Sequence, residues 1–322
     1  MGQLVDGVWQ EVENRIDGGR YRRPSTLYRN WVTPDGSPGP SGEGGFPAQA
    51  GRYHLYVCLA CPWAHRTLIF RALKKLDDAI SVTAVSPLMG ADGWVFDGND
   101  PDTINHKSKL SEIYLLADPR YTGRVSVPVL WDKQRRTIVN NESSEIIRML
   151  NSAFAAFTDD RTDYYPPDLR TAIDDINQLV YENINNGVYR AGFAVTQEAY
   201  AEAFGQVFAA LDHVERLLSQ HRYLAGNRLT EADWRLFTTL VRFDAVYYSH
   251  FKCNLRRIVD YPSLSNYVRD LYQVPRVAPT VDIAQIKTHY YASHRKINPT
   301  GIVPLGPALD FTAPHDRGRF EG

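Results

Sequence analysis

The order of predicted strands and helices constrains this chain most, because strands alternate with helices in its first half only. Residues 53–58 form a β-rich stretch, and after Pro62 apolar residues recur at spacings of three and four as far as Leu76. A second strand is predicted at 80–85. A strand, a helix and a strand within about 35 residues form a βαβ motif.

Two more strands and a helix are predicted to complete this half. The strands cover 125–131 and 137–139, and the helix opens at 141–145. Residues 88–122 hold several glycines and a proline and are predicted to be an irregular insertion. The first half therefore has the order βαβ followed by ββα.

From residue 168 onward the apolar spacing is helical throughout. Thr230 and Asp233 form a predicted capping box at the start of one of these helices. We therefore predict an α/β domain followed by an all-α domain. The expected parts are an N-terminal extension with a Pro/Gly-rich loop at 1–45, the α/β domain at 46–158, the helical domain at 159–296 and an irregular tail at 297–322.

Composition excludes several classes of partner. The chain has 36 Lys and Arg against 37 Asp and Glu, so it offers no global attraction for nucleic acid or an anionic membrane. No apolar run approaches the roughly 20 residues that span a bilayer. The first residues do not form a secretory signal, and three cysteines suit a reducing compartment. We expect a cytoplasmic protein that binds neither nucleic acid nor membrane.

Cys61 is the residue whose position points most directly to chemistry. Pro62 fits the first position of a helix, so the Cys61 sulfur is predicted at a helix N-terminus. Backbone N–H groups there favour the thiolate, which is the nucleophilic form. The alternative is a buried packing cysteine. Cys58 lies in the preceding strand, where a packing role is favoured over that of a resolving thiol.

Val127-Pro128 and Glu142-Ser143 are the other two motifs. A proline that opens an apolar strand is tolerated at an edge or in a cis turn, and the residue before it can present its backbone to a peptide-like ligand. Ser143 is predicted to cap a helix and to bind a carboxylate there, while Glu142 receives an ammonium group. An ordinary helix cap is the alternative.

Together these motifs resemble a glutathione transferase with a catalytic cysteine, and more narrowly a glutathionyl-hydroquinone reductase of the xi class. The fold implied is a thioredoxin-like N-terminal domain, here 46–158, followed by an all-α domain. The resemblance runs from about residue 50 to residue 305. Its supporting strings are 61–67 (CPWAHRT), 93–94 (GW), 124–131 (RVSVPVLW), 141–143 (NES), 186–193 (NGVYRAGF) and 289–291 (HYY).

The resemblance implies a glutathione site and a groove between the two domains. Glutathione is expected to pair with the backbone of Val127 and to place its γ-glutamyl end at Glu142 and Ser143. Trp94 lies in a glycine-rich insertion, which predicts a position outside the core. The implied glutathione-binding residues are Trp94, Arg124, Val125, Ser126, Val127, Glu142 and Ser143.

The implied reaction is reduction of glutathionyl-hydroquinones. Cys61 attacks the glutathionyl sulfur, the hydroquinone leaves, and a second glutathione releases oxidised glutathione. Tyr189 is nominated as the residue that moves a proton at the ring, and Tyr247 and Tyr290 as hydroxyls that stabilise the Cys61 thiolate. Tyr248, Tyr291 and His294 are weaker candidates. Glutathione is a co-substrate, with no metal, flavin or nicotinamide, and a homodimer is expected.

Two other functions fit the same motifs. An omega-like thioltransferase or dehydroascorbate reductase would share Cys61 and the glutathione site but would not need the tyrosines. A non-catalytic binding module would keep the fold alone, and the intact Cys61-Pro62 pair argues against it.

Overall fold

A computed structural model describes residues 2–12 and 16–320, and the chain divides into two compact units. The first unit holds residues 1–13 and 24–162, and the second holds 14–23 and 163–322. The four-part division by residue number stays a prediction. No helix in the described ranges is long and apolar enough to cross a membrane.

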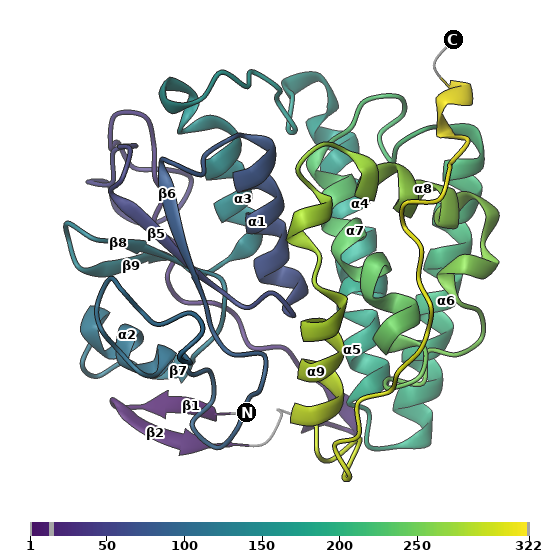
Figure 1. The fold of residues 1–322 in the computed structure, drawn as a ribbon, viewed down its shortest axis with the longest axis horizontal. Coiled ribbons are helices and arrows are strands. Elements are labelled where there is room, and N and C mark those ends of the chain that lie inside the picture. Colours follow the sequence, from purple (N-terminus) through teal and green to yellow (C-terminus); the bar gives the residue numbers. More distant parts are fainter. Residues whose placement is uncertain (1, 13–15, 321–322) are drawn as a thin grey trace. The chain divides into compact units, whose positions relative to one another are not determined.

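The first unit is built on a four-stranded sheet (Figure 1). Strand order is β6-β5-β8-β9, with β5 and β6 parallel and the other neighbours antiparallel. Helices α1 and α3 pack against each other on one face of this sheet. The elements are β5 (Tyr53–Val57), α1 (Pro62–Leu73), β6 (Ile80–Ala84), β8 (Val129–Asp132), β9 (Thr137–Asn140), α3 (Ser143–Ser152) and the 3₁₀ turn η1 (Ala155–Phe157). The predicted βαβ–ββα order is confirmed.

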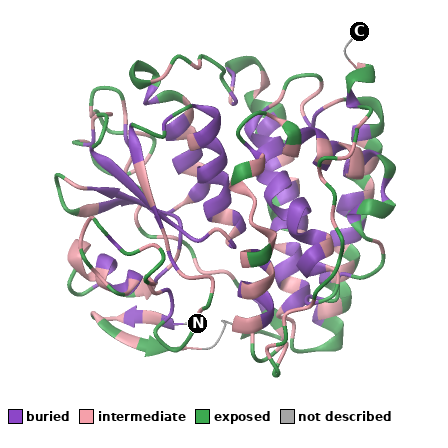
Figure 2. Ribbon diagram, in the orientation of Figure 1, coloured by how far each residue is buried: buried purple, intermediate pink, exposed green. Residues whose placement is uncertain are grey.

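Burial explains why this sheet is the core of the first unit. All five residues of β5 and all four of β8 are buried, as Figure 2 shows. Strands covered on both faces read as nearly continuous apolar runs, and Leu130 and Trp131 belong to such a run. Arg52 and Asp132 form a buried ion pair beside the first residues of β5.

Two predictions for the first unit are wrong. The segment 88–122 is not irregular throughout, because it contains α2 (Leu110–Ala117), and the short β7 (Gly123–Arg124) follows it directly. Residues 125–128 are not strand, and β8 begins only at Val129. The reason is that the N–H and C=O of Ser126 both pair with the Tyr114 hydroxyl instead of with a neighbouring strand.

The N-terminal residues also form strands. β1 (Gly2–Val5) pairs antiparallel with β2 (Val8–Glu11) and with β7, which makes a second, three-stranded sheet. Asp6 and Gly7 both have positive φ in the turn between β1 and β2. This Asp-Gly pair is the turn chemistry that a two-residue hairpin needs.

The second unit is helical, as predicted, apart from the two-residue strands β3 (Ile16–Asp17) and β4 (Arg20–Tyr21). α7 is buried along its whole length (Figure 2), and the capping box between Thr230 and Asp233 is confirmed. The α-helices are α4 (Arg170–Val180), α5 (Gly187–Gly192), α6 (Gln197–Gln220), α7 (Glu231–Arg242), α8 (Pro262–Gln273) and α9 (Ile283–Ser293). The π-helical turns are η3 (Tyr181–Asn185) and η4 (Phe243–Tyr247), and the 3₁₀ turns are η2 (Pro167–Leu169), η5 (Ile258–Asp260), η6 (Ala278–Thr280) and η7 (Arg317–Phe320).

The C-terminal segment after α9 is fastened to this unit at several points. Gln273 donates to the carbonyls of Phe311 and Ala313, at 3.0 and 2.9 Å. Arg317 is fully buried and donates to the carbonyls of Leu218, His221 and Arg222 at the end of α6.

Candidate functional site

Three segments of the first unit meet at one edge of its sheet. β5 runs antiparallel to β8, and the pair Tyr56↔Val129 puts the end of β5 beside the start of β8. β8 also runs antiparallel to β9, and the pair Leu130↔Asn140 brings the end of β9 to the same edge. The chain just after β5, just before β8 and just after β9 therefore converges, and these stretches carry the three predicted motifs.

Cys61 lies at the N-terminus of α1, as predicted. It is the N-cap residue in extended conformation, Pro62 follows at the first helical position, and the side chain is half-buried. The Cys61 Sγ lies 3.8 Å from the carbonyl oxygen of Val127. The Val127-Pro128 peptide bond is cis. The structure thus brings the first two motifs into contact.

Arg66 links the same helix to the third motif. Its side chain is buried, and Nη1 donates to the Ser143 Oγ at 3.4 Å. The guanidinium also lies over the Trp63 ring, with 4.6 Å from Cζ to the ring centroid. One turn of α1 therefore carries Cys61 at its start and a fixed positive charge that reaches the N-terminus of α3.

The prediction that Ser143 caps α3 is wrong. Glu142 is the N-cap, and its Oε1 accepts from the backbone N–H of Ser144 at 3.2 Å. The chain turns one residue early because the Asn140 Oδ1 accepts the backbone N–H of Glu142 at 2.7 Å. Ser143 is buried as the first helical residue, and Thr26 donates to the other carboxylate oxygen of Glu142.

Tyr114 is a residue that our sequence analysis missed. It is fully buried in α2, and its hydroxyl donates to the Ser126 carbonyl at 2.8 Å and accepts the side-chain amide of Asn141 at 3.0 Å. One hydroxyl therefore joins the residue before Val127 to the residue before Glu142. The helical spacing of Leu110, Ile113 and Tyr114 was the available signal.

The other predicted glutathione-binding residues lie in the same unit. Trp94 is 7% exposed, so the prediction that it lies outside the core is wrong; its carbonyl accepts the Leu110 N–H, which ties it to the first turn of α2. Arg124 is half-buried in β7, and Val125 is buried.

The predicted tyrosines form a hydrogen-bonded cluster in the second unit. The Tyr290 hydroxyl bonds to the hydroxyls of both Tyr189 and Tyr247, the latter at 2.9 Å. Tyr189 comes from α5, Tyr247 from η4 and Tyr290 from α9. Burial, reinforced by the two neighbouring phenols, raises the pKa of Tyr290 well above 10. This phenol is therefore neutral at physiological pH and can both donate and accept a hydrogen bond.

Phe251 orients this cluster. Its ring stacks on Tyr247, with centroids 5.5 Å apart, and meets the Tyr189 ring edge-on at 5.4 Å. Gly192 permits the close approach of α5, because a Cβ at that position would lie 2.2 Å from the Phe251 ring. The glycine in the string at 186–193 thus has a packing reason.

The weaker candidates lie in the second unit too, outside the hydrogen bonds of the three tyrosines. The Tyr291 hydroxyl pairs with the Ser249 Oγ, and the His294 Nδ1 is 3.2 Å from the His250 Nε2. Burial lowers the pKa of His250 to about 4 and that of His294 well below 6.5. Tyr248 is half-buried just after η4. The described residues contain no group of His, Cys, Asp or Glu side chains that could hold a metal ion.

Comparison with known proteins agrees with this architecture. Residues 60–153 match the model of the glutathione S-transferase N-terminal domain, and residues 197–270 match that of the C-terminal domain. The chain is 56% identical to the glutathionyl-hydroquinone reductase YqjG of Escherichia coli strain K12, over 98% of both chains. It is 46% identical to the glutathione S-transferase omega-like 2 of Schizosaccharomyces pombe, over 90% of this chain and 94% of that one.

Solved structures give the same result. The glutathione-bound structure of the Escherichia coli K-12 protein YqjG matches with a TM-score of 0.92 at 55% identity, over 98% of this chain and 99% of that chain. A xi-class glutathione transferase from Natrialba magadii matches with a TM-score of 0.91 at 48% identity, over 99% and 97%. The chain belongs to the glutathione transferase family. Its place there is among the xi-class glutathionyl-hydroquinone reductases.

Proposed function

We propose that this chain reduces glutathionyl-hydroquinones to hydroquinones with glutathione as the reductant. The contact between Cys61 at the N-terminus of α1 and the carbonyl of Val127 carries this proposal, because it sets a nucleophilic sulfur beside backbone that a tripeptide can pair with. The family supports it, since the relative from Escherichia coli that is named as such a reductase shares 56% of the aligned residues over 98% of this chain.

The site residues are assigned as follows in this proposal. Glutathione pairs with the backbone of Val127, and its γ-glutamyl end meets Glu142 and Ser143 at the start of α3. Arg66 adds positive charge at the same helix end, where a carboxylate is favoured. Trp94 and the run 124–126 bind the remainder of the tripeptide.

The reaction has two stages. In the first, the Cys61 thiolate forms a bond to the glutathionyl sulfur while the sulfur–carbon bond to the ring breaks, and the ring carbon gains a proton. This step is favourable when the ring first tautomerises to a keto form, so that the leaving group resembles an enolate. In the second, a glutathione thiolate attacks the mixed disulfide, releases oxidised glutathione and regenerates Cys61. The ring carbon thus gains two electrons while two glutathionyl sulfurs, one from the substrate and one from the second glutathione, are oxidised to a disulfide.

The tyrosine cluster is assigned the proton transfers at the ring. Tyr290 is neutral and bonded to two other phenols, so the three hydroxyls can pass a proton along their row. In this assignment Tyr189 acts at the ring, while Tyr247 and Tyr290 support the thiolate and the relay.

Mass spectrometry after mixing tests the proposal directly. The protein is mixed with one equivalent of a glutathionyl-hydroquinone without added glutathione, and the adduct is located by peptide mapping. We expect one glutathione on Cys61 and release of the hydroquinone.

Cys61→Ser should give neither product yet bind glutathione as the wild type does, because the peptide-like contacts remain. Cys58→Ser is the matched control, since Cys58 is fully buried and should leave turnover largely intact. An adduct elsewhere, or turnover by Cys61→Ser, would show the mechanism to be wrong.

An omega-like thioltransferase is the second candidate, and the name of the Schizosaccharomyces pombe relative favours it. Such an enzyme reduces dehydroascorbate or mixed disulfides through the same cysteine. Comparing kcat/KM for a glutathionyl-hydroquinone and for dehydroascorbate separates the two. We expect preference for the hydroquinone, and the tyrosine variants should affect only that substrate.

We also propose that the protein works as a cytoplasmic homodimer that needs glutathione alone, without metal, flavin or nicotinamide. The family resemblance supports this assignment. Light scattering coupled to size exclusion should give twice the mass of one chain, and a monomer mass at working concentration would contradict it.

A further inference from the structure

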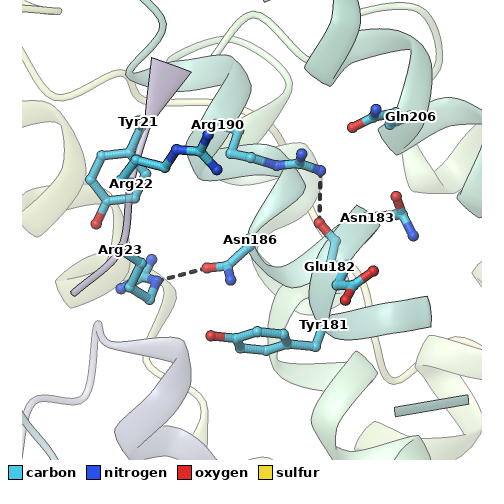
Figure 3. Close-up of a pocket in the computed structure, with 9 residues that line it drawn as sticks. All are labelled: Tyr21, Arg22, Arg23, Tyr181, Glu182, Asn183, Asn186, Arg190 and Gln206. Carbon is cyan, nitrogen blue, oxygen red and sulfur yellow. Dashed lines mark hydrogen bonds between the residues drawn. The ribbon is translucent and has the colours of Figure 1, made fainter. Parts of the chain in front are cut away.

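A polar pocket of about 380 Å³ lies in the second unit, separate from the hydrogen bonds of the tyrosine cluster (Figure 3). The segment 21–23 forms one side, and η3, α5 and α6 supply the others. The lining residues are Tyr21, Arg22, Arg23, Tyr181, Glu182, Asn183, Asn186, Arg190 and Gln206. None of them is used by the mechanism proposed above.

The pocket carries an excess of positive charge. Three of its lining residues are arginines, against a single carboxylate on the exposed Glu182. Arg23 is held in place, because its Nε donates to the Asn186 Oδ1 at 2.7 Å and its guanidinium lies 4.7 Å from the centroid of the Tyr189 ring. Arg22 is exposed beside it and forms an exposed ion pair with Asp17 at 3.4 Å.

Among the lining arginines, Arg190 is the one whose positive charge is least balanced by neighbouring groups. Its Nη2 donates to the backbone carbonyl of Glu182 at 2.8 Å, as Figure 3 shows. Its Nε is buried and has no acceptor among the described residues, and no carboxylate there lies within ion-pair distance of it. Burial lowers the pKa of Arg190, and the carboxylates of Glu202 and Glu182 offset this effect only in part.

Gln206, which lies on α6, adds a hydrogen-bond acceptor to the lining of the pocket. Its Oε1 is buried and has no donor among the residues that the structure describes. A buried donor and a buried acceptor that both lack partners cost free energy unless a bound group satisfies them. A ligand that carries an oxyanion and also a hydroxyl or N–H donor would satisfy both atoms.

We propose that this pocket binds a small organic oxyanion that bears a hydroxyl group, with Arg190 and Arg22 facing the oxyanion and Gln206 accepting from the hydroxyl. Arginine suits this task because its planar guanidinium donates two parallel hydrogen bonds to a carboxylate or a phosphate. The pocket shares no lining residue with the proposed glutathione site and requires nothing from the proposed reaction.

Titration calorimetry of the full chain in low-salt buffer without phosphate tests the proposal. The probes are glycerol 3-phosphate, glycerate, inorganic phosphate and uncharged glycerol, each with and without saturating glutathione. We expect one saturable site for glycerol 3-phosphate or glycerate with a dissociation constant below about 10 mM. The affinity should fall as sodium chloride is added, and glycerol should not bind. The stronger of the two charged probes identifies phosphate or carboxylate as the preferred head group.

Arg190→Gln should weaken binding about tenfold or more, because a charge-assisted hydrogen bond is lost. Arg228→Gln is the matched control, since Arg228 is exposed, pairs with Asp168 and lies outside the pocket. Gln206→Leu should keep the affinity for inorganic phosphate but remove the advantage of glycerol 3-phosphate over it. This second variant leaves the arginines intact, so it tests the pocket even where Arg190→Gln fails to fold.

Three outcomes would overturn the proposal. The first is no saturable binding of either charged probe, which would mean that the pocket holds water only. The second is equal affinity in the wild type, Arg190→Gln and Gln206→Leu. The third is competition with glutathione, which would place the probes in the glutathione site.

Discussion

Tyr290 shows how burial fixes the protonation state of a single residue. Its phenol lies between two others and is removed from water, so its pKa stays well above 10. A neutral phenol in a row of hydroxyls donates one hydrogen bond and accepts another. The direction of those bonds can reverse without any side chain moving, which is what a proton relay needs.

Removing one hydroxyl from this row should separate the two stages of the reaction. Tyr189→Phe is expected to slow release of the hydroquinone by about 10- to 100-fold, because a general acid contributes at least that much. Single-turnover kinetics should show the resolution of the Cys61–glutathione disulfide unchanged. Tyr272→Phe is the control, since Tyr272 is a partly buried phenol whose ring lies tilted against Phe311 with centroids 5.2 Å apart. Equal slowing of both stages would contradict the role of Tyr189.

His54 makes stability depend on pH. It is buried in β5 with its Nδ1 2.7 Å from the Ser81 Oγ, and burial lowers its pKa to about 4. The unfolded chain takes up this proton below about pH 6.5, whereas the folded chain does so only near pH 4. The contribution is therefore complete above pH 6.5 and is lost as the pH falls toward 4.

Urea denaturation at pH 6.5 and at pH 5 measures this effect. The wild type should lose up to about 2 kcal/mol more than His54→Asn over that interval, because each histidine contributes at most about 1.4 kcal/mol per pH unit. Asparagine keeps a polar atom near the position of the Nδ1. His106→Asn is the control, since it makes the same substitution at an exposed histidine. Identical losses in wild type and His54→Asn would refute the assignment.

At the scale of elements, α2 positions the residues of the proposed glutathione site without supplying any of them. The Tyr114 hydroxyl reaches both Ser126 and Asn141, so it fixes the spacing between the backbone of Val127 and the start of α3. We regard Tyr114 as a positioning residue, since it acts through its neighbours.

Tyr114→Phe should therefore loosen glutathione binding. We expect the KM for glutathione to rise by about 2- to 10-fold with kcat nearly unchanged, which corresponds to one neutral hydrogen bond. Tyr53→Phe is the matched control, because it removes a hydroxyl bonded to the Pro47 carbonyl at the other end of β5. A fall in kcat at unchanged KM would show that Tyr114 does not act through glutathione binding.

Much of the fold followed from sequence because local signals agreed with the tertiary structure. The apolar period of α1, the capping box of Thr230 and Asp233, and the Cys61-Pro62 boundary are each set within a few residues of chain. The three motifs of the first unit were also named from sequence, and the sheet register explains why they converge.

The errors came from interactions that are distant in sequence or obscured locally. β8 begins only at Val129 because the backbone of Ser126 pairs with Tyr114, which lies 12 residues away in the sequence. α2 was missed because the glycines before it dominated the segment. The hairpin of β1 and β2 had a visible signal in Asp6-Gly7, but its third partner, β7, could not be inferred from local pattern.

At the scale of the whole molecule, the C-terminal segment is part of the helical unit. Arg317→Ala should lower the free energy of unfolding by roughly 3 kcal/mol, because the carbonyls at the end of α6 lose their charged hydrogen-bond donor. Thermal melting reports this as a lower Tm. Arg319→Ala, at an exposed arginine that pairs with Asp316, should change it little. Equal melting of both variants would mean that the segment is not needed for stability.

The attachment of the C-terminal segment through Arg317 also determines where proteolytic cleavage would destabilise the second unit. Leu305 is fully exposed between α9 and Arg317, so a single cut there would leave every helix from α4 to α9 covalently joined while separating the arginine from them. The fastening would then depend on a peptide that can diffuse away. The lifetime of the second unit in a cell lysate thus depends on an exposed loop that contains no proposed catalytic or binding residue.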